Sequence, residues 1–247
     1  MKIGFFDSGK GGLLVAKAVQ VAMPLYDYLY FGDTANLPYG DKSEADILKL
    51  TQEGIRVLFD EGCSIVVVAC NTASVKTLRQ LQNQWLPSAF PGRKLLGVVV
   101  PTVEHLATLP IKKVLLLATK RTVDSGKYEI ELHKLETYIE LFTQAAPELV
   151  PLIESDDIVT AVQTAKGYIS RQVDLNNGLD TVILGCTHYS LIVGDLRSLF
   201  PDITFLAQTE IIPNKLQEYL ERHFEIKNEL STTGTFTIFF TGDRFST

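Results

Sequence analysis

Two cysteines in this sequence stand directly after buried, strand-like runs and in closely similar surroundings. Cys70 follows the run 64–69, and Cys186 follows the run 180–185. Polar residues suited to beginning a helix come next in both places, and a thiol at a helix N-terminus lies in a positive potential that favours its thiolate. Two such thiols on opposite sides of one carbon could remove a proton from one face and return it to the other without a cofactor.

Three further side chains could assist these thiols. His188 could exchange a proton with Cys186, and Glu154 could orient or activate His188. Asp7, at the end of the first predicted strand, could serve Cys70 in the same way. Two alternatives remain open at this point. Either thiol taken alone could be a buried structural cysteine, and Cys70, Cys186 and His188 could together bind zinc, although no ligand pair has the usual local spacing.

Two loops are also candidates for a binding site. The glycine-rich segment Asp7–Gly12 follows the first strand, where backbone amides could approach an anion at the start of a helix. A tight turn capped by Asp7 or Ser8 is the plainer interpretation, because the segment fits neither the P-loop nor the dinucleotide-binding pattern. The loop Leu37–Ser43 could cover a pocket with its amides facing a carboxylate, although Tyr39 could equally be a packing residue.

Composition excludes several classes of protein. The 247 residues are 46% hydrophobic and 21% charged, with a net charge of −6, so a nucleic-acid-binding surface is not expected. Three cysteines without a C-x-x-C pair disfavour a disulfide framework and a structural zinc ribbon. The apolar runs are too short to span a membrane, and the first residues have no secretory pattern. We therefore expect a cytoplasmic protein.

The elements that must position these residues alternate between short apolar strands and amphipathic helices, which predicts parallel sheets covered on both faces. Ser43 is expected to cap a helix whose apolar stripe includes Ile47 and Leu58. Other helices are expected near Lys166–Gly178 and from about Pro213 to Arg222. The predicted strands are Ile3–Phe6, Tyr28–Phe31, Ile65–Ala69, Gly97–Val100, Lys113–Ala118, Leu149–Ile153, Thr181–Leu184, Thr204–Leu206 and Thr235–Phe240.

The strands fall into two similar series that appear in the same order, with a crossing near Pro101. We interpret this as an internal duplication that gives an α/β fold of two similar parallel-sheet lobes related by pseudo-symmetry, with the active site between them. Residues 1–100 and 205–247 are predicted to form the first lobe, and residues 101–204 the second. Because ligands bind beyond the carboxyl ends of the strands in such sheets, the residues named above are well placed for a shared site.

The motifs resemble those of the glutamate racemases, within the cofactor-independent aspartate/glutamate racemase superfamily. The resemblance extends over nearly the whole chain. It rests on six short segments that fall in order along it, which are Phe6–Gly12, Phe31–Thr34, Pro38–Gly40, Ala69–Ser74, Val150–Glu154 and Gly185–Tyr189. The resemblance implies flavodoxin-like lobes and interconversion of L- and D-glutamate, in which Cys70 and Cys186 are the catalytic acid/bases and Asp7, Glu154 and His188 assist them. The product D-glutamate would supply peptidoglycan synthesis.

The resemblance also implies a set of substrate contacts. These are Asp7, Ser8, Pro38, Tyr39, Gly40, Asn71, Thr72, Thr119, Thr122, Thr187 and His188. No cofactor and no metal are expected, and the partners expected are the small-molecule substrate and a second copy of the chain in a homodimer. Some positions depart from the family pattern. Ala207 and Gln208 stand where an Asp-Ser pair is usual, and Ala118, Ala146 and Ser190 replace a glycine, a cysteine and a proline.

Three rival functions follow from the same sequence. A sibling racemase acting on aspartate or a hydantoin would differ mainly in pocket size and in its contacts with the side chain of the substrate. A two-lobed solute-binding protein is disfavoured by the paired thiols and by the lack of an export signal. A zinc-dependent hydrolase would need a metal bound by the thiols.

Overall fold

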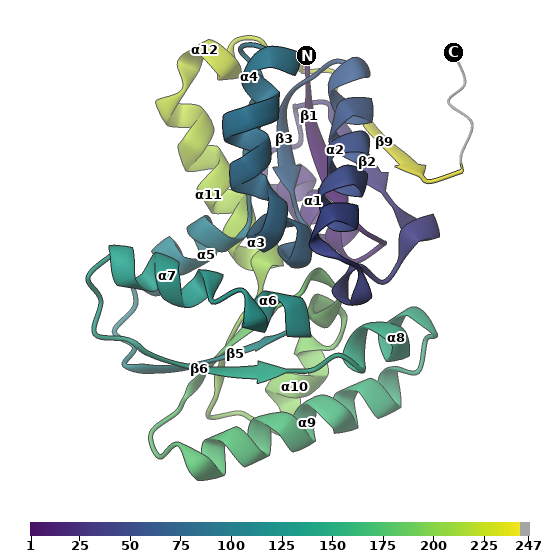
Figure 1. The fold of residues 1–247 in the computed structure, drawn as a ribbon. Helices are drawn as coiled ribbons and strands as arrows, with labels where there is room; N and C mark the ends of the chain where they lie inside the picture. Colours follow the sequence, from purple (N-terminus) through teal and green to yellow (C-terminus); the bar gives the residue numbers. More distant parts are fainter. Residues whose placement is uncertain (243–247) are drawn as a thin grey trace.

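The computed structural model describes residues 1–242, which form two α/β lobes, each built on its own sheet (Figure 1). The first sheet has the strand order β4-β3-β1-β2-β9, and the second has the order β6-β5-β7-β8. All strand pairs in both sheets are parallel. The predicted architecture of two parallel-sheet lobes is therefore confirmed.

The first lobe has a central sheet with helices on both faces. Its strands are β1 (Lys2–Asp7), β2 (Tyr28–Gly32), β3 (Cys63–Val68), β4 (Lys94–Gly97) and β9 (Phe236–Phe240). Its helices are α1 (Gly12–Ala22), α2 (Glu44–Asp60), α3 (Asn71–Gln80), α4 (Leu86–Ala89), α11 (Gln208–Arg222) and α12 (Phe224–Lys227). Strand β3 is buried along its whole length, as expected for a central parallel strand covered on both faces.

Apolar side chains fix these helices on the sheet. Val15 of α1 and Ile212 of α11 share one core with β1 and β3, and Ile47 and Leu58 of α2 lie in the core on the opposite face. The hydroxyl of Ser43 accepts the amide of Asp46 at 3.1 Å, so the predicted cap of α2 is confirmed. Shorter helical segments at Thr34–Asn36, Tyr39–Asp41 and Leu81–Trp85 complete this lobe.

The second sheet and its helices occupy the lower half of Figure 1. The strands are β5 (Lys113–Ala118), β6 (Glu140–Ala145), β7 (Thr181–Gly185) and β8 (Thr204–Leu206). The helices are α5 (Val99–Leu106), α6 (Lys120–Asp124), α7 (Lys127–Lys134), α8 (Leu149–Glu154), α9 (Ile158–Leu175) and α10 (Val193–Leu199), with a 3₁₀ helix at Thr187–Leu191. Ile211, near the start of α11, packs with Val99 and Leu116 in a core on this side, so α11 contacts both lobes.

The two sheets share a strand order. Apart from β9, each runs second, first, third, fourth in the order in which its strands occur along the chain, which is the flavodoxin-like arrangement. Cys70 follows the third strand of the first lobe, and Cys186 follows the third strand of the second. The similarity of the two lobes, predicted from the repeated series of strands, is therefore confirmed, and it places the two thiols at equivalent positions.

Two predicted strands are wrong in a similar way. Leu149–Ile153 is helical, within α8, and the neighbouring strand is β6, at residues 140–145. The apolar residues after Gly97 begin α5 at Val99 rather than continuing a strand. A short apolar run does not distinguish a buried strand from a buried helix. In both helices the third residue is a proline, which the first helical turn tolerates because its missing amide would have had no partner there.

Two helices begin earlier in the chain than predicted. Helix α11 begins at Gln208, five residues before the predicted start, with Pro213 inside it, and α9 begins at Ile158 rather than near Lys166. Strand β8 pairs with β7 in the second sheet, so the predicted lobe limit at residue 205 falls within a strand of that sheet. The division into lobes stays a prediction, and residues 243–247 of its first lobe lie outside the described part of the chain.

Candidate active site

The carboxyl ends of strands from both lobes border one small cavity. Cys70 lies just beyond β3 and Cys186 just beyond β7, and both thiols line this cavity of about 50 Å³. Most of the predicted site residues line it as well. They are Ser8, Pro38, Tyr39, Gly40, Cys70, Asn71, Thr72, Thr119, Cys186, Thr187 and His188. The fold thus brings together side chains that lie up to 180 residues apart in the sequence.

Three predicted residues lie one contact away from the cavity. Asp7 accepts a hydrogen bond from the Thr187 hydroxyl at 3.4 Å, which links the two lobes. Glu154 pairs with the ring of His188, and the Thr122 hydroxyl lies 3.0 Å from that of Thr119. These residues can therefore act on the cavity only through the side chains that line it.

Sequence reasoning missed several lining residues. They are Leu37, Asp41, Lys120, Pro147, Val150 and Pro151. Leu37 and Asp41 belong to the loop Leu37–Ser43, which was expected to be able to cover a pocket, and Lys120 follows Thr119, so these three residues lie next to predicted site residues. Val150 and Pro151 lie in the segment wrongly assigned to a strand, and a strand would have presented different side chains to the site. No sequence signal marked Pro147, which precedes that segment.

Cys70 is the N-cap residue of α3. Its sulfur accepts the amide of Ala73 at 3.5 Å and lies 3.3 Å from the hydroxyl of Ser8. Burial, and after it the nearby carboxylate of Asp7, raise the pKa of Cys70 to about 12, although the two hydrogen bonds act in the opposite direction. The prediction that the helix N-terminus would favour a thiolate here is therefore wrong, because desolvation outweighs the helix.

Cys186 has different neighbours. It precedes a five-residue 3₁₀ helix and makes no capping hydrogen bond with its side chain. Instead, its sulfur lies 3.8 Å from Nδ1 of His188, and Nε2 of His188 lies 2.5 Å from a carboxylate oxygen of Glu154. The three side chains form a chain of thiol, imidazole and carboxylate that leads away from the cavity.

The linked side chains of Cys186, His188 and Glu154 include charged groups. Burial opposes a positive charge on His188, but the hydrogen bonds to Cys186 and Glu154 and the charge of Asp7 raise its pKa to about 10. The hydrogen bond from His188 lowers the pKa of Glu154, against partial burial and together with the positive charge of His188 and of Lys10. His188 is therefore an imidazolium paired with a carboxylate at neutral pH.

The glycine-rich turn after β1 binds its own carboxylate. Oδ2 of Asp7 accepts the amides of Gly9 at 3.1 Å and Gly12 at 3.0 Å, so those amides are not presented to an external anion. Burial raises the pKa of Asp7, while the charge of His188 and these two amides oppose that shift. A Cβ atom at Gly11 would lie 2.7 Å from the backbone nitrogen of His188, so this glycine allows the lobes to touch.

The loop that carries Tyr39 is held from both lobes. The Tyr39 hydroxyl donates to Asp33 at 2.7 Å, and Nε of Arg121, from α6, donates to the carbonyl of Gly40 at 3.2 Å. The hydroxyls of Thr72 and Thr119 meet 3.0 Å apart across the same junction. Polar contacts between the lobes therefore border the cavity, which at about 50 Å³ is well below the roughly 300–1,000 Å³ of common ligand pockets.

A larger cavity of about 310 Å³ lies elsewhere, between α3, α5 and α11. Its lining within residues 1–242 includes lysines, arginines and Glu104 but neither cysteine nor histidine. We place the candidate active site at the smaller cavity, because the side chains able to exchange a proton with carbon lie there.

The remaining cysteine and the tryptophan are packing residues, and neither lines the small cavity. Cys63 lies in β3, in the core formed with α2, and Trp85 packs with Phe59 and Phe90. Within residues 1–242, no group of three or more His, Cys, Asp or Glu side chains is arranged to hold a metal ion. No helix in that part of the chain has both the length and the apolar character needed to cross a membrane.

Known proteins resemble this chain along most of its length. A family model described as Asp/Glu/Hydantoin racemase matches residues 14–213. A glutamate racemase of Ruegeria pomeroyi is 35% identical over 235 residues, which cover 90% of this chain and 86% of the relative. A glutamate racemase of Phenylobacterium zucineum is 36% identical over 249 residues, which cover 91% and 87% of the two chains.

Solved structures agree with these matches. A glutamate racemase from Bacillus anthracis superposes with a TM-score of 0.84 at 30% identity, covering 98% of this chain and 89% of the other. One from Francisella tularensis, in complex with D-glutamate, has a TM-score of 0.84 at 29% identity, covering 99% and 89%. The predicted enzyme class, an isomerase of the racemase type, is confirmed. The chain belongs to the Asp/Glu/Hydantoin racemase family.

Proposed function

We propose that this protein interconverts L- and D-glutamate without a cofactor, using Cys70 and Cys186 as the two acid/bases. The observation that carries the proposal is that thiols from equivalent strand ends of two similar lobes line the same cavity. The relatives named as glutamate racemases, one of them solved with D-glutamate, support glutamate as the substrate. A substrate held between the lobes would present one face of its Cα to each sulfur.

The reaction is a proton exchange in two halves. A thiolate on one side takes the Cα proton, and the electrons of the C–H bond pass to the carbon and its carboxylate. The thiol on the other side then gives its proton to the opposite face of Cα. The net result is an inverted centre and two sulfurs that have exchanged protonation states, so the reverse reaction uses the same atoms.

The surroundings of the two sulfurs favour one distribution of protons. Burial keeps the proton on Cys70, whose pKa is raised to about 12, and the His188 imidazolium lies next to Cys186. We therefore propose that Cys186, the sulfur with a cation beside it, is the first of the two to take the Cα proton. The cation next to Cys186 compensates the negative charge that burial would otherwise penalise.

Proton transfer by the thiols cannot account for the whole rate. General acid–base catalysis contributes roughly 10²–10⁴-fold, whereas the Cα proton of an amino acid is very weakly acidic. We assign the remainder to stabilisation of the negative charge that develops on the substrate carboxylate. The hydroxyls of Ser8, Thr72 and Thr119 line the cavity and can donate to that charge in a site closed to water.

The cavity must enlarge to admit an amino acid. In this structure the hydroxyls of Thr72 and Thr119, two residues that line it, lie 3.0 Å apart, and its volume is only about 50 Å³. We propose that the lobes part to admit the substrate and close on it, which would exclude water at the moment of reaction.

The cellular part of the proposal is that D-glutamate from this reaction supplies peptidoglycan synthesis. Cys63, Cys70 and Cys186 are all free thiols, which fits a protein of the reducing cytoplasm. A homodimer is proposed on the resemblance to the glutamate racemases, and light scattering coupled to gel filtration tests it. A monomer at assay concentration would refute that part alone.

The proposal is tested by circular dichroism on L-glutamate and, in parallel, on L-aspartate, with no cofactor added. We expect the optical signal of L-glutamate to decay to zero, and NMR in D₂O to find deuterium at Cα of the product. Decay of the signal with L-aspartate alone would identify aspartate, and not glutamate, as the substrate. Product without solvent deuterium would contradict exchange through the thiols.

A further inference from the structure

A buried pair of side-chain amides joins three elements beside Cys70. Nδ2 of Asn71 donates to Oε1 of Gln208 at 2.7 Å, and Nε2 of Gln208 donates back to Oδ1 of Asn71 at 2.9 Å. The hydroxyl of Tyr128 donates to the same Oδ1 at 2.8 Å. The three residues are only 1–2% exposed, so these hydrogen bonds are shielded from water. The amide of Asn71 is therefore held at both its nitrogen and its oxygen.

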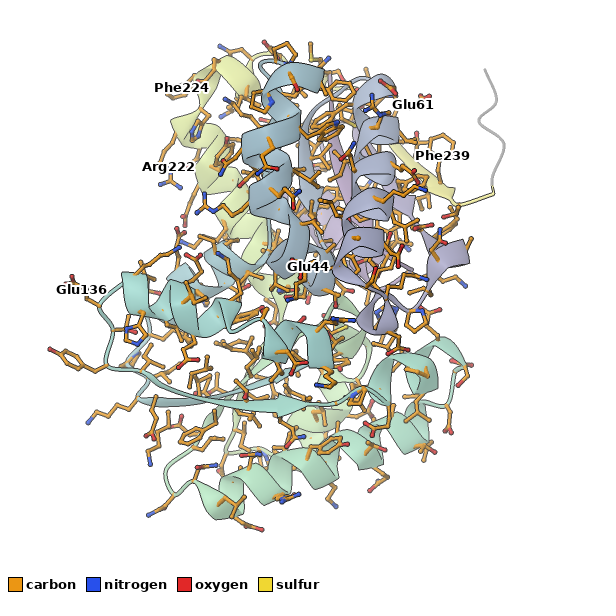
Figure 2. All side chains as sticks on the ribbon, in the orientation of Figure 1. Glu44, Glu61, Glu136, Arg222, Phe224 and Phe239 are labelled. Atoms are coloured by element: carbon orange, nitrogen blue, oxygen red, sulfur yellow. The ribbon has the colours of Figure 1, made fainter. Side chains whose placement is uncertain are left out.

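The three residues come from different parts of the fold. Asn71 is the first residue of α3 and follows Cys70, whereas Tyr128 belongs to α7 and Gln208 is the first residue of α11. Helix α7 packs on the second sheet, and α11 runs from the junction of the lobes to the outer surface, where Figure 2 shows Arg222 at its far end. The contacts of Asn71 therefore connect the N-terminus of α3 to elements on both sides of the junction.

Gln208 occupies a position where the sequence departs from the family pattern, in which an Asp-Ser pair is usual. The side chain of a serine at this position is shorter by two bonds, and its single hydroxyl has only one hydrogen to donate to Asn71. The glutamine reaches Asn71 with one donor and one acceptor at once. Ala207 and Gln208 together are buried, so this change sits in the interior rather than on the surface.

We infer that Gln208 and Tyr128 are positioning residues that fix the amide of Asn71, and with it the N-terminus of α3, for contact with the amino-acid substrate. A primary amide carries two N–H groups, of which Gln208 takes one. The other belongs to a side chain that lines the cavity, and it can donate to a carboxylate of the substrate. This role rests on the proposed function, because it assumes that an amino acid enters the cavity.

Gln208→Leu is the variant that tests this inference, because leucine keeps most of the volume but neither donates nor accepts a hydrogen bond. We expect KM for L-glutamate to rise about tenfold while kcat changes little, since Asn71 would bind ground state and transition state alike. Gln217→Leu, an exposed glutamine on the same helix, is the matched control and should leave both constants unchanged. Tyr128→Phe should raise KM by a smaller factor, because Gln208 still donates to Oδ1.

A double-mutant cycle separates positioning from a general structural effect. In an Asn71→Ala background, Gln208→Leu should cause no further rise in KM, because the group that it orients is gone. An equal rise in both backgrounds, or a rise below about twofold in the parent, would overturn the inference. Circular dichroism spectra and melting curves confirm that each variant is folded before its kinetics are compared.

A second measurement does not depend on the substrate. Alkylation of Cys70 by iodoacetamide, followed by peptide mass spectrometry, should become several-fold faster in Gln208→Leu but not in Gln217→Leu, because the side chain of Asn71, next to Cys70 in the cavity lining, is no longer held in place. A wild-type protein without glutamate racemisation would refute the proposed function. Unchanged alkylation of Cys70 in Gln208→Leu would independently refute the inference.

Discussion

The two lobes present the same type of residue at equivalent strand ends but surround it differently. Cys70 caps a ten-residue α-helix and has the hydroxyl of Ser8 as its side-chain neighbour. Cys186 precedes a short 3₁₀ helix and has the imidazolium of His188, backed by Glu154. A duplicated backbone therefore supplies two similar positions, and the neighbouring side chains give the two positions different electrostatics.

This difference teaches that the strand-end position by itself does not create a reactive thiol. At Cys70 the helix N-terminus is present, yet burial raises the pKa to about 12. In the second lobe the nearest helix is short, but a buried cation takes its place. A full charge next to a sulfur stabilises a negative charge there more strongly than the partial charge of a helix end does. The interaction is strong in a buried site because water screens it little.

The largest expected effect comes from removing either sulfur. Cys70→Ala and Cys186→Ala should each lower kcat by at least roughly 10²–10⁴-fold, because each removes the acid/base on one face of Cα. Racemisation followed by circular dichroism measures this loss. The matched control is Cys63→Ala, which removes the third buried thiol, on β3, and should stay active if folded. Activity near that of the wild type in either test variant would refute the role of that sulfur.

The next largest effect tests the asymmetry itself. His188→Asn removes the cation beside Cys186 and should lower kcat about 100-fold, since the thiolate there loses its stabilising charge. The two enantiomers have equal free energy, so kcat/KM must fall equally in both directions, whereas kcat for the two directions can diverge. Initial rates from L- and from D-glutamate measure both constants. Equal loss of kcat in both directions would indicate that His188 serves the two sulfurs alike.

A smaller effect is expected on the side of the first lobe. Ser8→Ala removes the hydroxyl that lies 3.3 Å from Cys70, and that contact lowers the pKa of the thiol. Its loss should slow proton removal by Cys70 by about threefold to tenfold, the effect of one hydrogen bond. Steady-state kinetics measure the change, and Ser8→Thr, which keeps a hydroxyl, is the control. A loss as large as that of Cys70→Ala would mean that Ser8 itself takes part in proton transfer.

The smallest effects concern pH. The pKa of His188 is raised to about 10, so activity should fall as pH rises through that value and the imidazolium is lost. Glu154→Gln removes a negative charge that raises the pKa of His188, and it should move this fall to lower pH. A pH–rate profile from pH 6 upwards measures the shift. If activity fell at the same pH in the wild type and in Glu154→Gln, His188 would be excluded as the titrating group.

The same pair makes stability depend on pH in a known direction. A histidine with a raised folded-state pKa stabilises most below its unfolded pKa of about 6.5, and the contribution is lost as pH rises towards 10. Glu154, with a lowered pKa, contributes above its unfolded pKa and loses that contribution in acid. At pH 6, Glu154→Gln should lower Tm by about 2–4 °C, the effect of about 1 kcal/mol, and the difference should shrink towards pH 10. Melting curves at several pH values measure this trend.

The sequence predicted the fold best where signals were repeated. Apolar runs ending in a small residue and a cysteine marked β3 and β7, and the cap at Ser43 marked the start of α2. It failed at Gly97–Val100 and Leu149–Ile153, because a short apolar run with a proline in it or directly after it fits the start of a buried helix as well as a strand. The second failure concerns a segment with two residues that line the cavity, Val150 and Pro151.

The sequence by itself determined which side chains could carry the chemistry, since residue type and position after a strand depend on local pattern alone. Only the tertiary structure decided how these side chains meet. It joined His188 to Glu154, brought Gln208 to Asn71 and gave the carboxylate of Asp7 the amides of its own turn. Burial and charge at one point depend on every element that surrounds it, so the proton states of Cys70 and His188 follow from the assembled lobes and not from the residues next to them in the chain.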